Sequence, residues 1–393
     1  MPANGSDVVI MANTTIPSGC IANAGNIDLY GGALTIEDGG QLYHSNEGVN
    51  ATVKKNISAY TNNNNGWYLI GYSFAENGAI AEMDNLLANE YDLYYYDEPT
   101  HYWRNYKNIA NSFAEMESAR GYLYANDQAV TLGLKGTLNT GNATVTLPLK
   151  YTNGIPLAGF NLVANPYAHN VTSFTGSNIS SDVYRMNDTK DNVVVDNISD
   201  NNPLKPGEGF FVKALADNAS ITFNSGARDE MTKTGRISLE ISANGKLIDR
   251  LILKQDGKPL EKFTLSDNGT KIFAMYDYQE MAVIPIEGNE QDIYFEAAKN
   301  GIYTISLSTE NTSMHYLHLI DNETGDDVDL LQTPSYSFVS MTTDYANRFK
   351  LVLSFAKNMC SVRQRPIPSA PKILACLASL GVSAFVLTLR ARF

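Results

Sequence analysis

The sequence predicts an all-β chain, and three observations carry that prediction. Short segments rich in aromatic and β-branched residues recur along the chain, glycine and asparagine stand between them, and one set of segments is duplicated. The 393 residues include 29 glycines and 23 tyrosines, and only 18% of them are charged. Such a composition favours strands and turns over helices. The length allows about two to four domains.

Residues 1–58 predict the end of a β-solenoid. Very short apolar segments follow one another in steps of a few residues, and glycine pairs such as Gly31-Gly32 and Gly39-Gly40 mark the corners. This spacing is typical of stacked coils rather than of a hairpin meander. So few coils bury little core, and no basic and apolar leader follows Met1. We therefore expect further coils upstream, in a longer chain.

Residues 59–148 and 149–232 predict two related β-modules. Three blocks recur in the same order at a separation of about 90 residues, each with glycine or a polar residue followed by alternating aromatic and aliphatic residues. The pairs of blocks are 66–74 with 159–167, 91–97 with 181–187, and 119–125 with 207–213. The apolar residues Ile80, Met83, Leu86 and Leu87 predict a short helix inside the first module.

Residues 233–356 predict an antiparallel β-sandwich. Alternating apolar residues recur at intervals of about ten residues, as expected for strands joined by tight turns. The turn signals are Asn244-Gly245, Asp256-Gly257, Asn268-Gly269, Asn300-Gly301 and Thr324-Gly325.

Residues 357–393 form a basic, apolar tail of different composition. No acidic residue follows Asp344, whereas six basic residues follow Ala356. The uncharged segment 373–389 is close to the length of a single membrane helix. The alternative is an unnatural or out-of-frame end joined to a soluble acidic protein. Contact with a membrane is expected only through this tail, if the tail is native.

Charge and cysteine content exclude several classes of protein. The net charge is −13, which opposes a phosphate backbone, so we expect no nucleic-acid partner. Cys20, Cys360 and Cys376 are too few and too scattered for a disulfide framework or a CxxC metal site. The common nucleotide-binding, nucleophile-elbow and zinc-helix motifs do not occur, so we expect no enzyme, no cofactor and no metal.

Two polar segments need a separate interpretation. His315 and His318 are three residues apart on a strand, point to opposite faces and cannot hold one metal ion together. The acidic segment 321–329 could gather calcium through its carboxylates, but it lacks the EF-hand order. We expect a solvated hairpin turn there.

The densest aromatic cluster lies in the first module. It consists of Tyr91, Tyr94, Tyr95, Tyr96, Tyr102, Trp103 and Tyr106. Tyr94 occupies the place of Tyr184 in the duplication, which indicates a structural role. Tyr95 and Trp103 are the candidate residues of a glycan-binding platform, because flat aromatic faces match the apolar faces of sugars. If so, both rings should be exposed on one face and nearly coplanar.

The segments 316–325, 329–331, 336–338 and 348–351 resemble the sandwich that precedes the sorting domain in Bacteroidota surface proteins exported by the type IX secretion system. Segments 159–167 and 207–211 are similar to the modules before it. The resemblance implies an extracellular or outer-membrane location. It implies a non-catalytic spacer or adhesion protein, with glycans or other surface proteins as partners. The alternative is an accessory, carbohydrate-binding region of a surface hydrolase whose catalytic domain lies upstream. The chain departs from the pattern at Ser354, where a sorting domain should follow.

Overall fold

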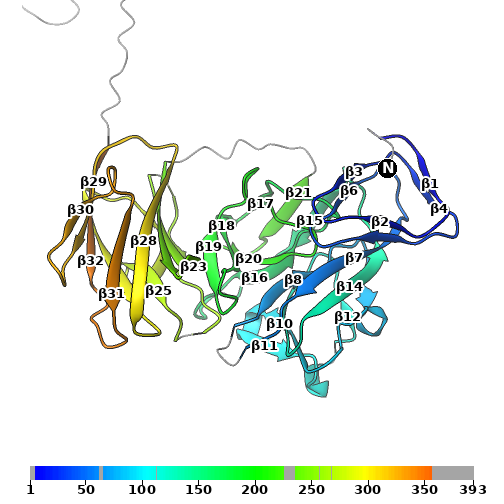
Figure 1. Ribbon diagram of the computed structural model, residues 1–393, viewed down its shortest axis with the longest axis horizontal. Coiled ribbons are helices and arrows are strands. Elements are labelled where there is room, and N and C mark those ends of the chain that lie inside the picture. Colours follow the sequence, from blue (N-terminus) through cyan, green and yellow to red (C-terminus); the bar gives the residue numbers. More distant parts are fainter. Residues whose placement is uncertain are drawn as a thin grey trace, which may run out of the picture. The chain divides into compact units, whose positions relative to one another are not determined.

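The computed structural model describes residues 5–61, 65–111, 113–224, 235–255, 257–266 and 268–355. Within these ranges the chain forms thirty-two strands and three single-turn 3-10 helices, which confirms the all-β prediction (Figure 1). Residues 1–355 form one compact unit. The tail 357–393, with Cys360, Cys376 and the expected membrane segment 373–389, lies outside the described residues. No helix among the described residues is long and apolar enough to cross a membrane.

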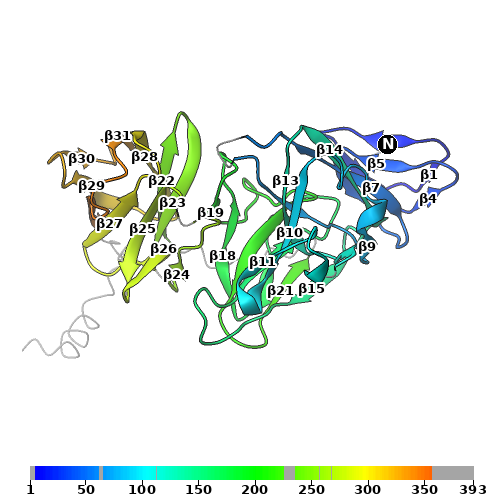
Figure 2. The ribbon, with the colours of Figure 1, turned by 90° about the horizontal axis from the view of Figure 1, so that it is seen from below.

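The first two coils are a β-solenoid, as predicted. One coil contains β1 (Val8–Ile10), β2 (Thr14–Ile16) and β3 (Ile21–Asn23), and the next contains β4 (Ile27–Leu29), β5 (Leu34–Ile36) and β6 (Gln41–Tyr43). Each strand pairs in parallel with its counterpart in the other coil, with Val8 opposite Ile27 and Thr14 opposite Leu34 (Figure 2). The side chains of Ile16, Leu34 and Ile36 point inward and are buried.

The solenoid continues without a break into the first module. Strand β7 (Asn50–Ile57) pairs in parallel with β5 on one side and antiparallel with β14 (Val130–Thr137) on the other. One hydrophobic core runs from Ile10 through Val53 to Leu134. A boundary at 58/59 therefore falls just after a strand that both parts share.

The two modules have the same strand order. In module 1 the sheet is β11 (Tyr102–Asn105), β10 (Tyr91–Asp97), β13 (Gly121–Asn126) and β8 (Tyr68–Gly71). In module 2 it is β19 (Val193–Asp196), β18 (Ile179–Met186), β20 (Gly209–Ala214) and β16 (Phe160–Ala164). The duplicated sequence blocks thus form equivalent strands in equivalent positions.

The outer strands repeat as well. Strand β15 (Thr144–Pro148) pairs with β21 (Ser220–Asn224) as β7 pairs with β14. By strand pairing, module 2 begins at β15, which precedes the boundary expected at 148/149. Two small additions differ between the modules: β9 (Gly78–Ala79) pairs with β12 (Glu115–Met116) in the first, and β17 (Thr175–Ser177) pairs with β21 in the second.

The helix expected in module 1 is only one 3-10 turn, η1 (Ile80–Glu82). Met83 already has extended backbone, and Asn85 has a left-handed φ of 60°, so the helix cannot continue. Ile80, Met83 and Leu86 are nevertheless buried, as their spacing indicated. The other single turns are η2 (Glu98–Thr100) and η3 (Ile109–Asn111).

The C-terminal part is one long sheet folded over a single core. In sheet order its strands are β30 (Asp327–Asp329), β29 (Met314–Asp321), β32 (Phe349–Phe355), β27 (Glu290–Glu296), β25 (Lys271–Tyr276), β26 (Gln279–Pro285), β23 (Lys246–Lys254), β22 (Arg236–Ala243), β28 (Gly301–Glu310) and β31 (Ser335–Ser340), with β24 (Leu260–Glu261) beside β26. Leu239 and Ile305 from one end share a core with Leu319 and Phe349 from the other. Figure 2 shows the long hairpin of β22 and β23, whose Asn244-Gly245 turn has φ of 52° and 72°, as two-residue hairpins favour.

One strand pair departs from the expected antiparallel pattern. Strand β23 pairs in parallel with β26, with Ile252 opposite Val283. Parallel neighbours need a crossover connection, and here the crossover contains β24 and Phe263. Phe263 is buried against module 2, 4.5 Å from the ring of Phe160 and 4.6 Å from that of Phe211. The crossover therefore joins the sandwich to the modules through a shared core.

Candidate functional site

Tyr95 and Trp103 lie on opposite faces of the module 1 sheet. Trp103 is directly opposite Tyr96 in the register of β10 and β11, so it shares the face of Tyr96, and Tyr95 points the other way. The ring of Tyr95 packs edge-on against Phe113 at 5.0 Å, and the guanidinium of Arg120 lies 4.3 Å from its centre. The expected common platform is therefore not formed.

Tyr94 and Tyr184 are equivalent in the structure, as the duplication predicted. Tyr94 pairs with Leu123, and Tyr184 pairs with Phe211 at the matching place. Tyr184 is fully buried, donates its hydroxyl to the carbonyl oxygen of Glu261 at 2.6 Å, and has a pKa raised well above the usual value by burial. Tyr94 is only half-buried and lines a cavity.

This cavity, which we call the aromatic pocket, has a volume of about 300 Å³. It is formed by four aromatic rings, two leucines and two polar residues: Tyr60, Trp67, Tyr94, Trp103, Leu123, Leu265, Asp191 and Ser266. The whole chain has two tryptophans, and both lie here. The sequence pointed to Trp103 but not to Trp67 as a site residue, although Trp67 lies in the first duplicated block and is the only other tryptophan.

The rings of the pocket stand at steep angles to one another. Trp67 meets Tyr60 at 80° with ring centres 5.9 Å apart, and meets Tyr94 at 62° and 6.1 Å. Trp103 is held edge-on by Tyr96 at 5.3 Å and by Phe211 at 5.9 Å. Such edge-to-face contacts are favourable. The rings therefore surround the cavity on several sides and do not form the flat surface on which a sugar ring stacks.

Asp191 supplies the charge at this pocket. Its Oδ1 accepts hydrogen bonds from the side-chain amide of Asn187 at 2.9 Å and from the hydroxyl of Thr189 at 2.6 Å, which fix the carboxylate.

The ammonium of Lys190, the residue before Asp191, does not lie in the pocket lining. It lies over the ring of Tyr68 at 5.2 Å, and Tyr68 follows Trp67 and points to the other face of the strand. Burial is the main cause that raises the pKa of the Tyr94 hydroxyl.

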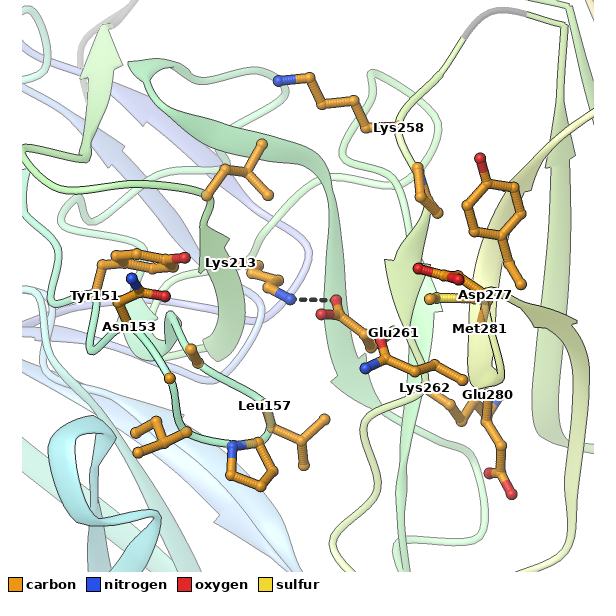
Figure 3. Close-up of a pocket in the computed structure, with 18 residues that line it drawn as sticks. Tyr151, Asn153, Leu157, Lys213, Lys258, Glu261, Lys262, Asp277, Glu280 and Met281 are labelled. Atoms are coloured by element: carbon orange, nitrogen blue, oxygen red, sulfur yellow. Dashed lines mark hydrogen bonds and ion pairs between the residues drawn. The ribbon is translucent and has the colours of Figure 1, made fainter.

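A larger groove of about 750 Å³ lies between module 2 and the sandwich (Figure 3). Tyr151, Asn153 and Leu157 line one side, and Lys258, Asp277 and Met281 line the other. Figure 3 shows the ion pair of Lys213 and Glu261 across it.

Two acidic residues of this groove pair with lysines. Glu280 pairs with Lys271 at 2.7 Å, and Glu261 pairs with Lys213. The ammonium of Lys262 turns away to the buried carboxylate of Asp249, 2.5 Å from its Oδ2. Of these three ion pairs, that of Lys213 and Glu261 joins module 2 to the sandwich. We therefore treat the groove as a junction and the aromatic pocket as the candidate site.

The other polar candidates have structural partners. His318 stacks on Tyr316 with ring centres 4.0 Å apart, its Nδ1 lies 2.7 Å from Asp327, and His315 is exposed. No group of three or more His, Cys, Asp or Glu among the described residues could hold a metal ion.

The acidic segment 321–329 forms a hairpin turn between β29 and β30. The buried guanidinium of Arg348 pairs there with Asp321 and with Glu323, each at 2.7 Å. This pairing lowers the pKa of Asp321 despite its burial. The guanidinium of Arg348 therefore occupies the position beside these two carboxylates that a calcium ion would take.

In comparisons with known proteins, no family model, no curated protein and no solved structure matches the chain.

Proposed function

We propose that this chain is a non-catalytic, cell-surface or secreted β protein whose modules act as a rigid spacer and adhesion region. The resemblance to proteins exported by the type IX secretion system supports the location. The continuity of its cores supports the spacer role, because a spacer must keep its ends at a fixed separation under load.

The observation that carries the proposal is the position of Phe263. Its ring, at the crossover of the sandwich, contacts Phe160, Tyr184 and Phe211 of module 2, and lies 6.0 Å from Tyr96 of module 1. One side chain thus belongs to a core shared by three parts of the chain. Burying a phenylalanine in this way stabilises the junction by about 1.5–3 kcal/mol.

Buried ion pairs surround this junction. Asp182 of module 2 accepts from Lys254 of the sandwich at 2.5 Å, and Asp196 accepts from Arg250 at 2.7 Å. All four side chains are at most 13% exposed. Fixed charge pairs contribute less to net stability than apolar burial, but they allow only one mutual orientation. This is what a stiff connection requires.

Single-molecule energy transfer tests the spacer role on the full chain. One dye goes on the exposed Cys20 of the solenoid, and the other on a cysteine introduced by Tyr345→Cys, a sandwich position that is 94% exposed. Cys360 and Cys376 are replaced by serine. We expect one narrow transfer distribution, and a broad one in Phe263→Ala. A broad or multiple distribution in the chain with Phe263 would contradict a rigid spacer.

The second candidate is an accessory carbohydrate-binding region of a surface hydrolase. Its support is the aromatic pocket, although the pocket has the form of a box and not of a platform. A glycan array of the full chain with Trp103→Ala distinguishes the two functions. Saturable glycan binding that the substitution removes would favour the accessory role. A broad glycosidase and protease screen of the full chain tests the proposal that the chain is not catalytic. Robust turnover would contradict that proposal.

A further inference from the structure

The aromatic pocket of module 1 occupies the place that Phe263 fills in module 2. The residues that contact Phe263 in module 2 are Phe160, Tyr184 and Phe211. Their equivalents in module 1 are Trp67, Tyr94 and Leu123, and all three line the pocket.

Two strand registers establish this equivalence independently of the sequence match. Tyr94 lies opposite Leu123 as Tyr184 lies opposite Phe211. Leu123 lies opposite Leu69 as Phe211 lies opposite Leu162, which places Trp67 and Phe160 two residues before equivalent positions. The two sites are therefore built on the same three strands of the same sheet.

One site is filled by an aromatic side chain of the chain itself, and the other is open. The crossover that inserts Phe263 into module 2 continues to Leu265 and Ser266, which line the pocket in module 1 but supply no aromatic ring. A cavity of about 300 Å³ is left. This volume lies at the lower end of the range for ligand pockets.

We propose that the aromatic pocket binds an aromatic side chain of a partner polypeptide, as module 2 binds Phe263. The steep angles between Tyr60, Trp67 and Tyr94 present edges and faces to one ring, the arrangement that aromatic groups prefer. In module 2 the equivalent rings of Phe160 and Tyr184 meet at 68° with centres 5.8 Å apart, close to the 62° of Trp67 and Tyr94. Phe263 stacks on Phe160 at 21° and meets Tyr184 at 66°. The inference goes beyond the spacer role and does not depend on it.

The hydrogen bonds that Tyr184 makes with the main chain around Phe263 in module 2 have no equivalent at Tyr94 in module 1. The hydroxyl of Tyr184 donates to the carbonyl oxygen of Glu261 and accepts from the N–H of Phe263 at 3.2 Å. The hydroxyl of Tyr94 instead interacts with Asp92 and Asn105. We therefore expect the ring of the partner residue to supply most of the binding free energy, so a single capped amino acid should bind in the millimolar range, at roughly 4 kcal/mol.

Tryptophan fluorescence reports this pocket alone, because both tryptophans line it. The full chain is titrated with N-acetyl-phenylalaninamide, and with N-acetyl-leucinamide, methyl glucoside and tetramethylammonium as competitors from other ligand classes. We expect a saturable change with the phenylalanine derivative, at an affinity at least tenfold above that for each of the others. Equal affinity for leucine, or tighter binding of the sugar or the cation, would overturn the proposal.

Two variants test the site itself. Ser266→Phe places an aromatic ring on a crossover residue that lines the pocket, so it should fill the pocket as Phe263 fills its counterpart, keep the melting temperature and abolish binding. Tyr102→Ala is the control: this residue lies next to Trp103 on β11, is 67% exposed and does not line the pocket, so binding should be unchanged. Binding that survives Ser266→Phe in a folded chain would overturn the proposal. Selection of peptides from a random library should enrich sequences with a central aromatic residue that N-acetyl-phenylalaninamide displaces, and enrichment without one would also contradict it.

Discussion

The main-chain N–H of Gly71 in module 1 donates a hydrogen bond to the carbonyl oxygen of Gly207 in module 2 at 2.9 Å. The equivalent residues make the reciprocal bond, from Ala164 to the carbonyl of Ala119 at 2.8 Å. Each module thus offers the same surface to the other, as in a two-fold symmetric dimer. The duplication has produced an internal pseudo-dimer, and this arrangement yields the first two predictions.

The two modules pack tightly at Gly71. A Cβ atom there would lie 2.6 Å from the Cβ of Ala164 and 2.6 Å from the carbonyl oxygen of Glu208. We expect Gly71→Ala to lower the free energy of unfolding by about 1–3 kcal/mol, the usual cost of overpacking. The control is Gly301→Ala, where the nearest atom is 4.0 Å away. Urea unfolding with equal losses for both variants would contradict a tight interface.

Gly207 and Ala119 both have left-handed backbone, with φ of 70° and 54°. Glycine adopts this conformation without strain, whereas alanine pays about 1 kcal/mol. We expect Gly207→Ala to destabilise the chain by about that amount, since its Cβ would have no close contact, and Ala119→Gly to stabilise it. Thermal unfolding of both variants checks the opposite signs. Shifts of the same sign would show that backbone strain does not govern these positions.

Phe263 should be among the most sensitive positions of the chain. Its replacement by alanine removes a ring that packs on Phe160 and Phe211, and we expect a loss of about 3–5 kcal/mol. The matched control is Tyr278→Ala in the same part of the chain, where the side chain is 97% exposed and the change should stay within about 0.5 kcal/mol. Similar losses in urea unfolding would contradict a shared core at Phe263.

Two buried histidines make stability depend on pH. His44 and His169 are each 3% exposed, and burial lowers the pKa of both below 6.5 although nearby main-chain carbonyls favour the charged form. Each Nδ1 donates to a carbonyl, of Asn46 at 3.0 Å and of Asn170 at 2.9 Å, which places the proton of the neutral ring on Nδ1. His169 also stacks on Tyr43 at 4.1 Å.

Below pH 6.5 the unfolded chain binds more protons at these histidines than the folded chain does, so stability falls as pH falls through that window. Each unit by which a pKa is lowered contributes about 1.4 kcal/mol. We expect the free energy of unfolding to drop between pH 7.5 and pH 5, and to drop less in the double variant His44→Gln, His169→Gln. If the free energy of unfolding changes with pH equally in the double variant, these two histidines are not the cause of the pH dependence.

The sequence predicted the repeating elements because they depend on local signals. Alternation identified most strands, the Asn244-Gly245 pair identified a hairpin, and the spacing of about 90 residues identified two modules of equal topology. The face on which Trp103 lies depends instead on the register between β10 and β11, which the turn at η2 and the left-handed His101 set. Sequence alternation alone does not reveal that register, so Tyr95 and Trp103 could not be separated.

The insertion of Phe263 also has no local signal. Its segment, Lys258 to Ser266, reads as a polar connection with isolated apolar residues. Only the three-dimensional arrangement shows that one of them fills a site in another module. The aromatic pocket could be recognised as its open counterpart only after the duplication and the strand registers had been combined.

Equilibrium unfolding with two local probes tests the account most directly. Trp67 and Trp103 report module 1, and a dye on a cysteine introduced by Tyr345→Cys reports the sandwich, with Cys20, Cys360 and Cys376 replaced by serine. The core that the two modules and the sandwich share at Phe263 predicts coincident transitions with one midpoint in urea, and separate midpoints in Phe263→Ala. Two well-separated transitions in the chain that retains Phe263 would contradict a single rigid body.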